Sequence, residues 1–507
     1  MRRGTINSLP QTSALPPEQR ASFKRQIGNR PFNRWLKPAA LGLLALIPAC
    51  STVGDVTNSV LGTGGPSRGQ PGYVRGFLGG VVADDPRAVL AGREVLSAGG
   101  NAADAAVAMG LTLTVTLPSR AGLGGGGACL AYAPDASSPG GGKPEAVLFV
   151  PLAPATTGRG ADRPAAVPMM ARGLFLLHAR YGSTPFETLI SSAEQLARFG
   201  VPTSRALAKD IAAVSGPLLA DPGARAVFSQ NGVPLTEGQP LRQPDLGGTL
   251  SQLRIAGVGD LYQGTLARRV ALVSQEIGGP IQLSDLRGGL PKLAAPLVRQ
   301  YGNDRVAFLP PPADGGLATA AAFDDLANNP NDTAGAVARY LSVLARYRAG
   351  GISATEVLAA QGLPAVGAPP FPASTSLVAM DRSGNAVACA LTMDNLFGTG
   401  RIMPGLGILA AASPAAVQPP LLSAGMVWND NIHAFRAAAG GSGQAGAPLA
   451  VAFALINTLK TGRPLSTPVP DPGRANVIAC SRYLPGETSE CGWANDPREA
   501  GLAMGAN

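Results

Sequence analysis

The sequence predicts a mixed α/β (α+β) fold, because strand-like apolar runs alternate with segments that carry helix-capping signals. Glycine and alanine are abundant, and aromatic residues make up only 5% of the 507 residues, which favours close packing of helices and strands. At this length the chain can bury a large core, as one large domain or as two to three smaller ones.

The first predicted elements are a strand and two helices. Residues 80–83 form a short apolar run typical of a strand, and Asp85, followed by a proline, is a helix N-cap. That helix is expected to run to about residue 98 and to stop at a pair of glycines. Asn101 caps the next helix and Asp104 occupies its first turn, where the helix dipole favours an acid.

A glycine-rich segment, residues 122–127, formally matches a dinucleotide-binding fingerprint. It follows a helix and leads into a predicted strand, 128–132, whereas that fingerprint follows a strand and opens a helix. We therefore expect no phosphate binding there. Further strands are predicted at 146–150 and 306–309, and residues 170–270 alternate helical patterns with polar loops.

The most informative segment is a predicted hairpin that follows three hydroxyl-bearing residues, 374–376. A Pro-rich loop, 363–373, is expected to deliver Ser374 to the surface. Strands are predicted at 377–380 and 386–393, joined by a turn that contains Gly and Asn. Taken alone, the segment is better interpreted as an ordinary hairpin with a Ser/Thr-rich entry.

The charge of the chain is concentrated near its start. The 41 Lys and Arg against 32 Asp and Glu give a net charge of +9. Residues 1–49 hold eight of the basic residues and one acid, so 33 basic and 31 acidic residues remain, a net of +2. The rest of the chain shows no basic patch, and no nucleic-acid partner is predicted.

An apolar run of about twelve residues follows the basic stretch and is too short to span a membrane. With its charged flank it is typical of a signal peptide, and residues 47–50 match a bacterial lipobox ending at Cys50; a buried core helix is the alternative. We expect residues 1–50 to be a lipoprotein signal peptide and 51–76 a flexible tether. The membrane partner is then a lipid anchor on Cys50, in the periplasm-facing bacterial envelope, with the outer membrane favoured over the inner.

Four cysteines follow Cys50 in the sequence. Cys480 and Cys491 lie in a Pro/Gly-rich loop with ten residues between them, and an exported chain allows them to form a disulfide. Cys129 and Cys389 sit in apolar runs and are predicted to be core thiols.

The chain has only two histidines, His178 and His433. His178 lies in a helical pattern and is interpreted as structural. Two histidines provide few candidates for a Ser-His-Asp triad or for the ligands of a zinc site, so neither a metal nor another cofactor is predicted. Nucleophilic catalysis without histidine needs another base, and a Ser or Thr at a newly made N-terminus has its own α-amine, with an unperturbed pKa near 8.

Several spaced blocks resemble γ-glutamyltranspeptidases. Residues 99–107 and 124–127 are similar to the long N-terminal signature of that family. Residues 373–407 resemble the segment where the family's precursor cuts itself and frees a nucleophilic Thr. Further similar blocks, in family order, are 168–182, 185–202, 261–265, 310–316, 494–498 and 501–503.

This resemblance covers most of residues 77–507 and implies a fold and a processing event. The implied fold is the four-layer αββα sandwich of N-terminal-nucleophile hydrolases, with two stacked antiparallel sheets between helical layers. The implied cut separates a large subunit, 77–373, from a small subunit, 374–507.

The resemblance also implies the catalytic residues. Ser374 takes the position of the nucleophile and Thr375 that of a second hydroxyl that orients it. Thr375 is the reserve nucleophile, since a shift of one residue in register exchanges the two. Gly440 and Gly441 match the oxyanion-hole glycines, whose N–H groups stabilise a tetrahedral intermediate.

The residues that recognise γ-glutamate in the family are less well kept. Val150 stands where the family has the Arg that binds the α-carboxylate, so a bidentate contact is lost. Arg120 and Arg401 flank Gly-rich loops and are candidates to replace it, although a solvated surface Arg is the simpler interpretation of each.

Three further positions are assigned to substrate binding by the same resemblance. Asp394 replaces an Asn of the strand-end motif, and Asn395 is adjacent to it. Of two paired serines only Ser423 remains, and the acidic stretch that grips the α-amine is missing.

The sequence therefore predicts a self-processing, γ-glutamyltransferase-like amidohydrolase. It would act on γ-glutamyl compounds such as glutathione, or on other small amides, through an acyl-enzyme on Ser374. The lost recognition residues also support an alternative, a non-catalytic envelope lipoprotein that retains the fold as a binding module.

Overall fold

The computed structural model describes residues 76–155, 161–370, 373–465, 469–486, 488–498 and 500–506. The predicted signal peptide, Cys50 and residues 51–75 of the predicted tether lie outside these ranges. All described residues belong to one unit of the chain, residues 65–507.

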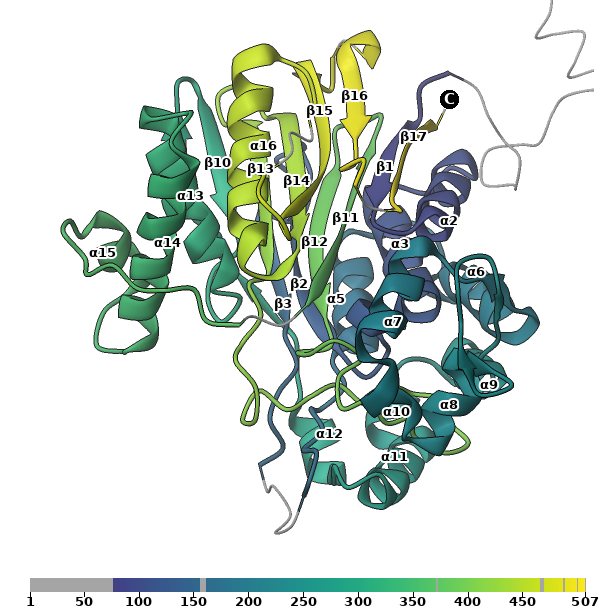
Figure 1. The fold of residues 1–507 in the computed structure, drawn as a ribbon. Helices are drawn as coiled ribbons and strands as arrows, with labels where there is room; N and C mark the ends of the chain where they lie inside the picture. Colours follow the sequence, from purple (N-terminus) through teal and green to yellow (C-terminus); the bar gives the residue numbers. More distant parts are fainter. Residues whose placement is uncertain are drawn as a thin grey trace, which may run out of the picture. The chain divides into compact units, whose positions relative to one another are not determined.

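Two stacked antiparallel sheets form the centre of this unit (Figure 1). The first sheet has seven strands among the described residues. In spatial order they are β17 (Leu502–Ala506), β1 (Gly79–Ala83), β11 (Ser374–Asp381), β12 (Ala386–Thr392), β2 (Gly126–Tyr132), β3 (Glu145–Phe149) and β8 (Lys292–Ala294).

The second sheet has six strands within the described part of the chain. In spatial order they are β16 (Cys491–Ala494), β15 (Arg474–Leu484), β14 (Ala434–Ser442), β13 (Ser423–Asn429), β10 (Asp304–Phe308) and β9 (Leu297–Tyr301). Two small hairpin-like pairs join β4 (Val201–Pro202) to β7 (Pro240–Leu241) and β5 (Ser229–Gln230) to β6 (Val233–Pro234).

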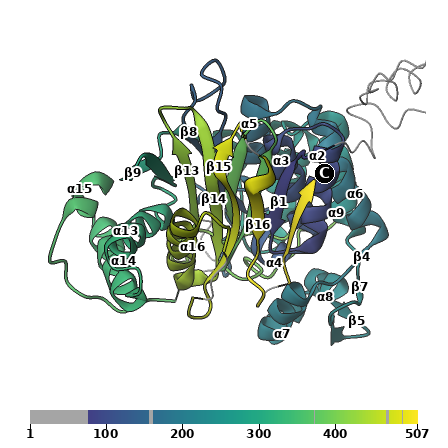
Figure 2. The same ribbon diagram turned by 90° about the horizontal axis from the view of Figure 1, so that it is seen from above.

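Helices cover the outer face of each sheet, as Figures 1 and 2 show from two directions. On the first sheet lie α2 (Pro86–Ser97), α3 (Ala102–Thr116), α4 (Pro118–Ala121), α5 (Met170–Tyr181), α6 (Phe186–Phe199) and α9 (Pro244–Ala256). On the second lie α13 (Gly315–Asn328), α14 (Thr333–Arg348), α15 (Ala354–Ala359) and α16 (Ala447–Thr461). The remaining helices are α7 (Arg205–Leu219), α8 (Pro222–Phe228), α10 (Asp260–Gln263), α11 (Thr265–Glu276) and α12 (Leu283–Gly288).

The core is divided by the sheets because strand side chains alternate between their two faces. On β11, Leu377 and Ala379 pack against the helices of the first sheet, whereas Val378 and Met380 pack against the second sheet. A third core lies between the second sheet and α13, α14 and α16. The observed order, helices–sheet–sheet–helices, confirms the predicted α/β (α+β), four-layer αββα sandwich.

The local signals placed most elements correctly. Asp85 caps α2 by accepting from Arg87 N at 2.9 Å, and Asn101 forms a reciprocal capping box with Asp104 at the start of α3. The β11–β12 turn contains Gly384 at φ +82°, a backbone conformation that favours glycine. The main difference is the start of β11, which lies at Ser374 rather than at residue 377.

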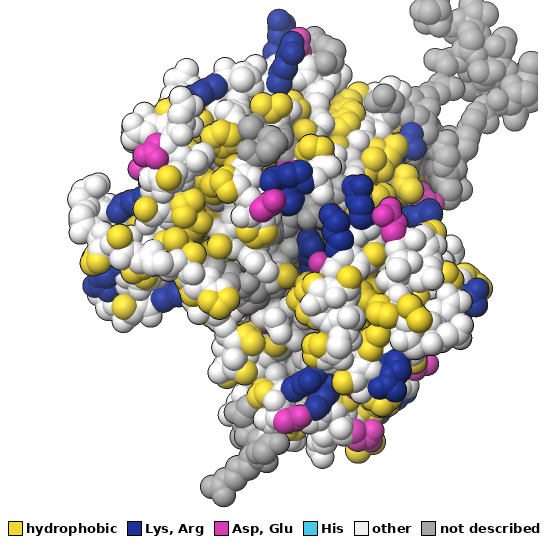
Figure 3. Space-filling view, in the orientation of Figure 1, with side chains coloured by type: hydrophobic (Ala, Val, Ile, Leu, Met, Phe, Trp, Pro, Cys, Tyr) yellow, Lys and Arg dark blue, Asp and Glu magenta, His cyan; other side chains and the backbone are white. Residues whose placement is uncertain are grey.

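Charged side chains of both signs are interspersed on the face drawn in Figure 3, where several Lys and Arg side chains lie beside acids. Ion pairs within the described structure include Arg254 with Glu194 and Arg299 with Asp324, at 2.7 and 2.8 Å. Such partly exposed pairs contribute little to stability, typically less than about 1 kcal/mol each.

Candidate active site

Ser374 is the first residue of β11 and pairs with Thr392 of β12. Only 2% of its surface is exposed, so the expectation that the preceding loop delivers it to the surface is wrong for the uncut chain. The reason is that β11 already begins at Ser374, which puts this residue inside the sheet. Its hydroxyl oxygen is buried and has no hydrogen-bond partner among the described residues.

The carbonyl group of the predicted scissile bond is held by a hydroxyl donor. Thr392 Oγ1 donates to Ala373 O at 2.9 Å, and Asp394 N in turn donates to Thr392 Oγ1 at 2.9 Å. A donor on a carbonyl oxygen stabilises the negative charge that develops there during nucleophilic attack. The bond between Ala373 and Ser374 therefore carries a polarising contact in the uncut chain.

The buried carboxylate of Asp84 contacts the two hydroxyl-bearing residues that follow Ser374. Asp84 Oδ2 accepts from Thr375 Oγ1 at 2.8 Å and from Ser376 N at 3.2 Å. Asp84 Oδ1 accepts from Asn476 Nδ2 at 2.8 Å, which brings in the second sheet. All four residues are at most 2% exposed.

Sequence analysis missed Asp84 and Asn476. Asp84 immediately follows β1 and precedes Asp85, and one acid is enough to cap α2. The second acid after a fully buried strand was therefore a usable signal. Asn476 lies 392 positions from Asp84, and no local pattern reveals their contact.

Two contacts fix how β11 faces the second sheet. Asn476 Nδ2 donates to Ser376 Oγ at 2.9 Å, and Cys480 Sγ lies 3.4 Å from Met380 Sδ. The two residues on each strand are four positions apart, so β11 and β15 keep a common register across the inter-sheet space. Because alternate residues share a face, Ser374 points into this space as Ser376 does.

The same register identifies what stands opposite Ser374. Moving two residues back along both strands from the Ser376–Asn476 contact places Ser374 of β11 opposite Arg474 of β15. Arg474 in turn pairs with Ser442 of β14. Ser442 Oγ is buried and, like that of Ser374, has no hydrogen-bond partner among the described residues. Arg474 itself pairs with Asp471 at 2.7 Å.

Gly440 and Gly441, the predicted oxyanion donors, lie inside β14 and pair with both β13 and β15. Their role as oxyanion donors stays a prediction. A Cβ atom on Gly440 would lie 2.9 Å from Ser376 Cβ. The glycine at this position lets the two sheets approach closely beside Ser376.

A second pair of candidate anion-binding amides lies just beyond the end of β14. Gly443 and Gln444 both adopt left-handed backbone conformations, with φ of +95° and +51°. Within the described ranges their N–H groups donate to no backbone or side-chain acceptor. They immediately follow Ser442, the residue level with Ser374.

Asp394 and Asn395, two of the predicted substrate-binding residues, follow the end of β12. The Asp394 carboxyl is 2% exposed, and burial raises its pKa to about 8. Asn395 donates to Gly398 O at 3.3 Å and lines a cavity of about 330 Å³ together with residues 396–400. The structure thus connects Asp394 to the Ala373 carbonyl through Thr392, and Asn395 to a space of small-molecule size.

Ser423 is not brought together with these residues. It is the first residue of β13, is fully buried, and donates to Leu421 O at 3.1 Å. Its neighbour across the ladder, Gly441, faces Val451 and Ala447 of α16. Ser423 therefore lies on the helix side of the second sheet. Side chains alternate along a strand, and its neighbour Ala424 is the one that faces the first sheet.

Arg120 and Arg401 are both engaged in ion pairs rather than being solvated surface residues. Arg120 binds Asp210 through two contacts of 2.8 Å. Arg401 binds Asp162 at 2.6 and 2.8 Å and also donates to Ile277 O at 2.7 Å. In both cases the guanidinium group already binds a carboxylate of the protein itself, so neither contact supports binding of a substrate carboxylate.

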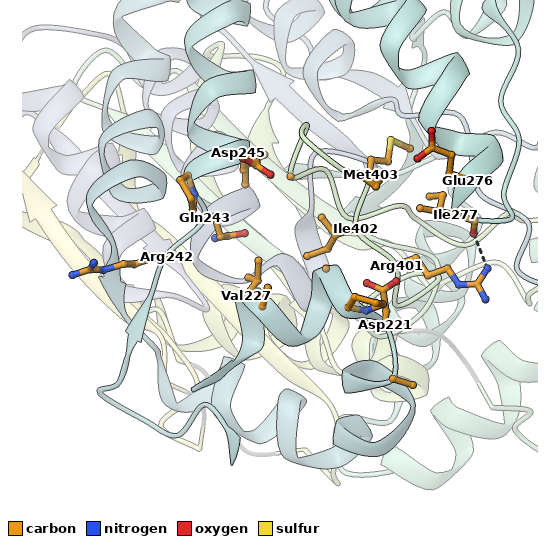
Figure 4. A pocket seen from close by; sticks show the side chains of 18 of the residues that line it. Asp221, Val227, Arg242, Gln243, Asp245, Glu276, Ile277, Arg401, Ile402 and Met403 are labelled. Carbon is orange, nitrogen blue, oxygen red and sulfur yellow. Dashed lines mark hydrogen bonds between the residues drawn. The ribbon is translucent and has the colours of Figure 1, made fainter. Parts of the chain in front are cut away.

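Arg401 lines a cavity of about 870 Å³, which Figure 4 shows with Asp221, Gln243 and Ile402 on its walls. Arg401 reaches toward Ile277 at one end of this space (Figure 4). The lining residues do not include Ser374, Thr375 or Thr392, so this larger cavity is separate from the residues around the predicted cut.

The prediction that Cys129 and Cys389 are free core thiols is wrong. They are buried, but they face each other directly across β2 and β12 and form a disulfide. Cys480 and Cys491 are likewise opposite each other on β15 and β16 and are joined. Cross-strand pairing, which the spacing in sequence does not reveal, brings both pairs together.

The histidines take no part in this site. His178 Nε2 lies 2.6 Å from Thr184 O and its ring packs against Phe186, which agrees with the structural interpretation. His433 lies in the turn between β13 and β14, at φ +47°. The described residues contain no cluster of three potential metal ligands.

The architecture and this constellation define the class of protein as an N-terminal-nucleophile hydrolase fold. The solved structure of cephalosporin acylase from Bacillus halodurans is similar, with a TM-score of 0.69 and 19% sequence identity. The similarity covers 87% of this chain and 97% of that one. At this identity the comparison establishes the fold alone.

Sequence comparison finds similarity to one family over about half of the chain. Residues 88–333 match the profile of the family described as Gamma-glutamyltranspeptidase. The Glutathione hydrolase proenzyme of Escherichia coli is 31% identical over 261 residues, which cover 48% of this chain and 44% of the relative. The Acylase ACY 1 proenzyme of Pseudomonas sp. (strain SE83) is 31% identical over 259 residues, with 48% and 46% covered. These similarities, each over just under half of the chain, are consistent with a divergent member of the γ-glutamyltranspeptidase superfamily.

The matched region has definite limits. The chain matches less than half the length of these two relatives. The family profile ends at residue 333, before the segment that contains Ser374. The nucleophile assignment therefore depends on the local motif and on the geometry described above.

Proposed function

We propose that this protein is a self-processing amidohydrolase whose nucleophile is Ser374, freed by cleavage of the bond between Ala373 and Ser374. The observation that carries the proposal is the contact between Thr392 Oγ1 and Ala373 O beside the unengaged hydroxyl of Ser374. The similarity to relatives that are named as proenzymes supports processing into a large and a small subunit.

Ser374 is favoured over Thr375 because their hydroxyls are engaged differently. The Thr375 hydroxyl already donates to Asp84, whereas the Ser374 hydroxyl has no partner in the described structure. Thr375 then serves as an orienting neighbour rather than as the attacking group.

Cleavage proceeds by acyl transfer from nitrogen to oxygen. Ser374 Oγ attacks the Ala373 carbonyl carbon, the C–N bond breaks, and the proton from Oγ ends on the new α-amine. Thr392 stabilises the oxyanion during this step. Water then hydrolyses the ester, which leaves a carboxylate on Ala373 and a free amino-terminal serine.

In turnover, the same α-amine accepts the Ser374 hydroxyl proton as Oγ attacks the substrate carbonyl. The leaving amine receives a proton, and water hydrolyses the acyl-enzyme in a second step. The N–H groups of Gly443 and Gln444 are the proposed oxyanion donors, because they follow the residue that is level with Ser374.

The proposed substrates are γ-glutamyl compounds such as glutathione, or other small amides. The cavity of about 330 Å³ beside Asn395 supports a small acyl group. Val150 in place of a carboxylate-binding Arg favours an acyl group that differs from γ-glutamate.

The test is intact mass and reducing electrophoresis of the purified protein during incubation. Wild type is expected to give two fragments separated between residues 373 and 374, and Ser374→Ala is expected to remain whole. Ser413→Ala, which alters another fully buried serine, should be cut at the wild-type rate. Cleavage that persists in Ser374→Ala and disappears in Thr375→Ala would move the nucleophile to Thr375.

A non-catalytic binding module is the second candidate function. It is favoured by the burial of Ser374 and by the loss of the γ-glutamate-binding Arg. A wild-type chain that stays whole during prolonged incubation would establish this alternative over the enzyme.

A further inference from the structure

The charge of Asp84 is not balanced by a cation in its immediate contacts. Its three hydrogen-bond donors are a hydroxyl, a backbone amide and a side-chain amide, from Thr375, Ser376 and Asn476. None of these three donors supplies positive charge. Only 2% of the residue is exposed, so water does little to solvate that charge.

We propose that Asp84 is a positioning residue whose negative charge raises the basicity of the α-amine released at Ser374. This inference rests on the proposed function, because the amine exists only after cleavage. In the uncut chain the same nitrogen belongs to a neutral peptide bond, so cleavage creates a positive charge beside a buried negative one.

The distances along β11 place the two charges close together. Asp84 Oδ2 is 3.2 Å from Ser376 N. A strand rises about 3.4 Å per residue, so the nitrogen of Ser374 lies within about 10 Å of the carboxylate. Thr375, whose hydroxyl donates to Asp84, is the residue between them.

Two of the other charged groups around this site have partners close by. Asp85 accepts from the Arg87 amide, and Arg120 is bound by Asp210. The neighbouring groups are Asp85 and Arg87 at the start of α2, Arg120 on α4 with Asp210 on α7, Asp394 after β12, and Arg474 on β15 with Asp471 and Asp496.

The sign of the effect follows from Coulomb's law. A negative charge stabilises the ammonium form of the amine, which raises its pKa and its affinity for the Ser374 hydroxyl proton. Replacing Asp84 by Asn removes the charge at nearly constant shape, so the amine should lose its proton at a lower pH. We expect a downward shift of about one pH unit.

The experiment measures the amine directly on the processed protein. Acetic anhydride labels only unprotonated amines, so the labelling rate of the small fragment's N-terminus between pH 6 and 10, read by mass spectrometry, gives its pKa. Asp84→Asn should lower this pKa by about one unit and move the acidic limb of kcat/KM for a chromogenic amide in the same direction.

Two further variants separate charge from packing. Thr375→Val removes the hydroxyl bonded to Asp84 but keeps the carboxylate, so the amine pKa should stay near the wild-type value. Asp84→Asn combined with Asn476→Asp restores a carboxylate at the contact and should recover most of the shift, which also covers the case that the single variant misfolds.

The outcomes separate this inference from the proposed function. A cut protein whose amine has the same pKa in wild type, Asp84→Asn and the double variant would overturn only the role of Asp84. The same holds if Thr375→Val reproduces the full shift of Asp84→Asn. A wild-type chain that is never cut overturns both, because no α-amine then forms.

Discussion

Asp394 carries a carboxyl group where water solvates its charge poorly. Burial raises its pKa from 3.8 to about 8, so the folded protein favours the protonated form. The resulting stabilisation is complete below about pH 4 and is lost as the pH rises through 8. This residue therefore makes the folded state less stable near neutral pH than in mild acid.

We expect Asp394→Asn to remove that dependence. In an uncut Ser374→Ala background, stability should fall by on the order of 2 kcal/mol between pH 5 and 7 relative to the Asp394→Asn version. Thermal or urea unfolding at several pH values measures the difference. Parallel pH dependences in the two proteins would show that Asp394 is already ionised when folded.

Thr392 makes a prediction about the rate of cleavage. Thr392→Val removes the donor to Ala373 O at nearly constant volume, and self-cleavage should slow by about 10²–10³-fold. The half-time on reducing gels measures this effect. Thr458→Val is the matched control, because that buried hydroxyl has no partner in the described structure; equal half-times for the two variants would contradict the role of Thr392.

For single residues, the sequence predicted those that lie within one short motif. It did not predict residues that only the fold places beside that motif. Ser374 and Thr375 are adjacent in a recognisable block. Asp84 is 291 positions away from Thr375, and only the pairing of β1 with β11 joins them. Gly440 was assigned from its match to the family's oxyanion-hole glycines, and its place inside β14, which extends to Ser442, was not readable from the sequence.

Strands β2 and β12 are joined by a disulfide that spans the predicted cut. The Cys129–Cys389 disulfide joins a strand before the predicted cut to a strand after it. Cut protein is therefore expected to migrate as one species without reductant and as two with it, while its intact mass increases by one water.

Cysteine variants test that link. Cys389→Ala should release the two fragments on a denaturing gel without reductant. Cys480→Ala breaks a disulfide that lies wholly within residues 374–507 and should leave the fragments joined. Separation of the wild-type fragments without reductant would show that Cys129 and Cys389 are not bonded in the protein.

The elements themselves were largely predictable, because their signals are local. Asp85 and Asn101 mark helix starts through their side-chain caps, and the apolar runs mark strands. The order of strands in each sheet was not readable from the residues. The first sheet combines β17 and β1, from opposite ends of the described chain, through long-range pairing that no local pattern encodes.

For the whole molecule, we propose export and lipid anchoring through Cys50. The two disulfides support an oxidising compartment such as the bacterial periplasm. Across the described ranges, none of the helices has both the length and the hydropathy needed to cross a bilayer.

The anchor can be tested by metabolic labelling with an alkyne fatty acid in a bacterial host. Wild type should be labelled and recovered with membranes, and Cys50→Ser should lose the label. Cys480→Ser controls for labelling at other thiols. Equal labelling of wild type and Cys50→Ser would rule out Cys50 as the attachment site.

The Cys129–Cys389 bond also changes how the processed protein responds to dilution. Two separate fragments would associate with a dissociation constant, and their assembled fraction would fall with concentration. A covalent link makes the encounter intramolecular, so each fragment meets its partner at a fixed effective concentration. The assembled fraction of the cut protein is then independent of its concentration.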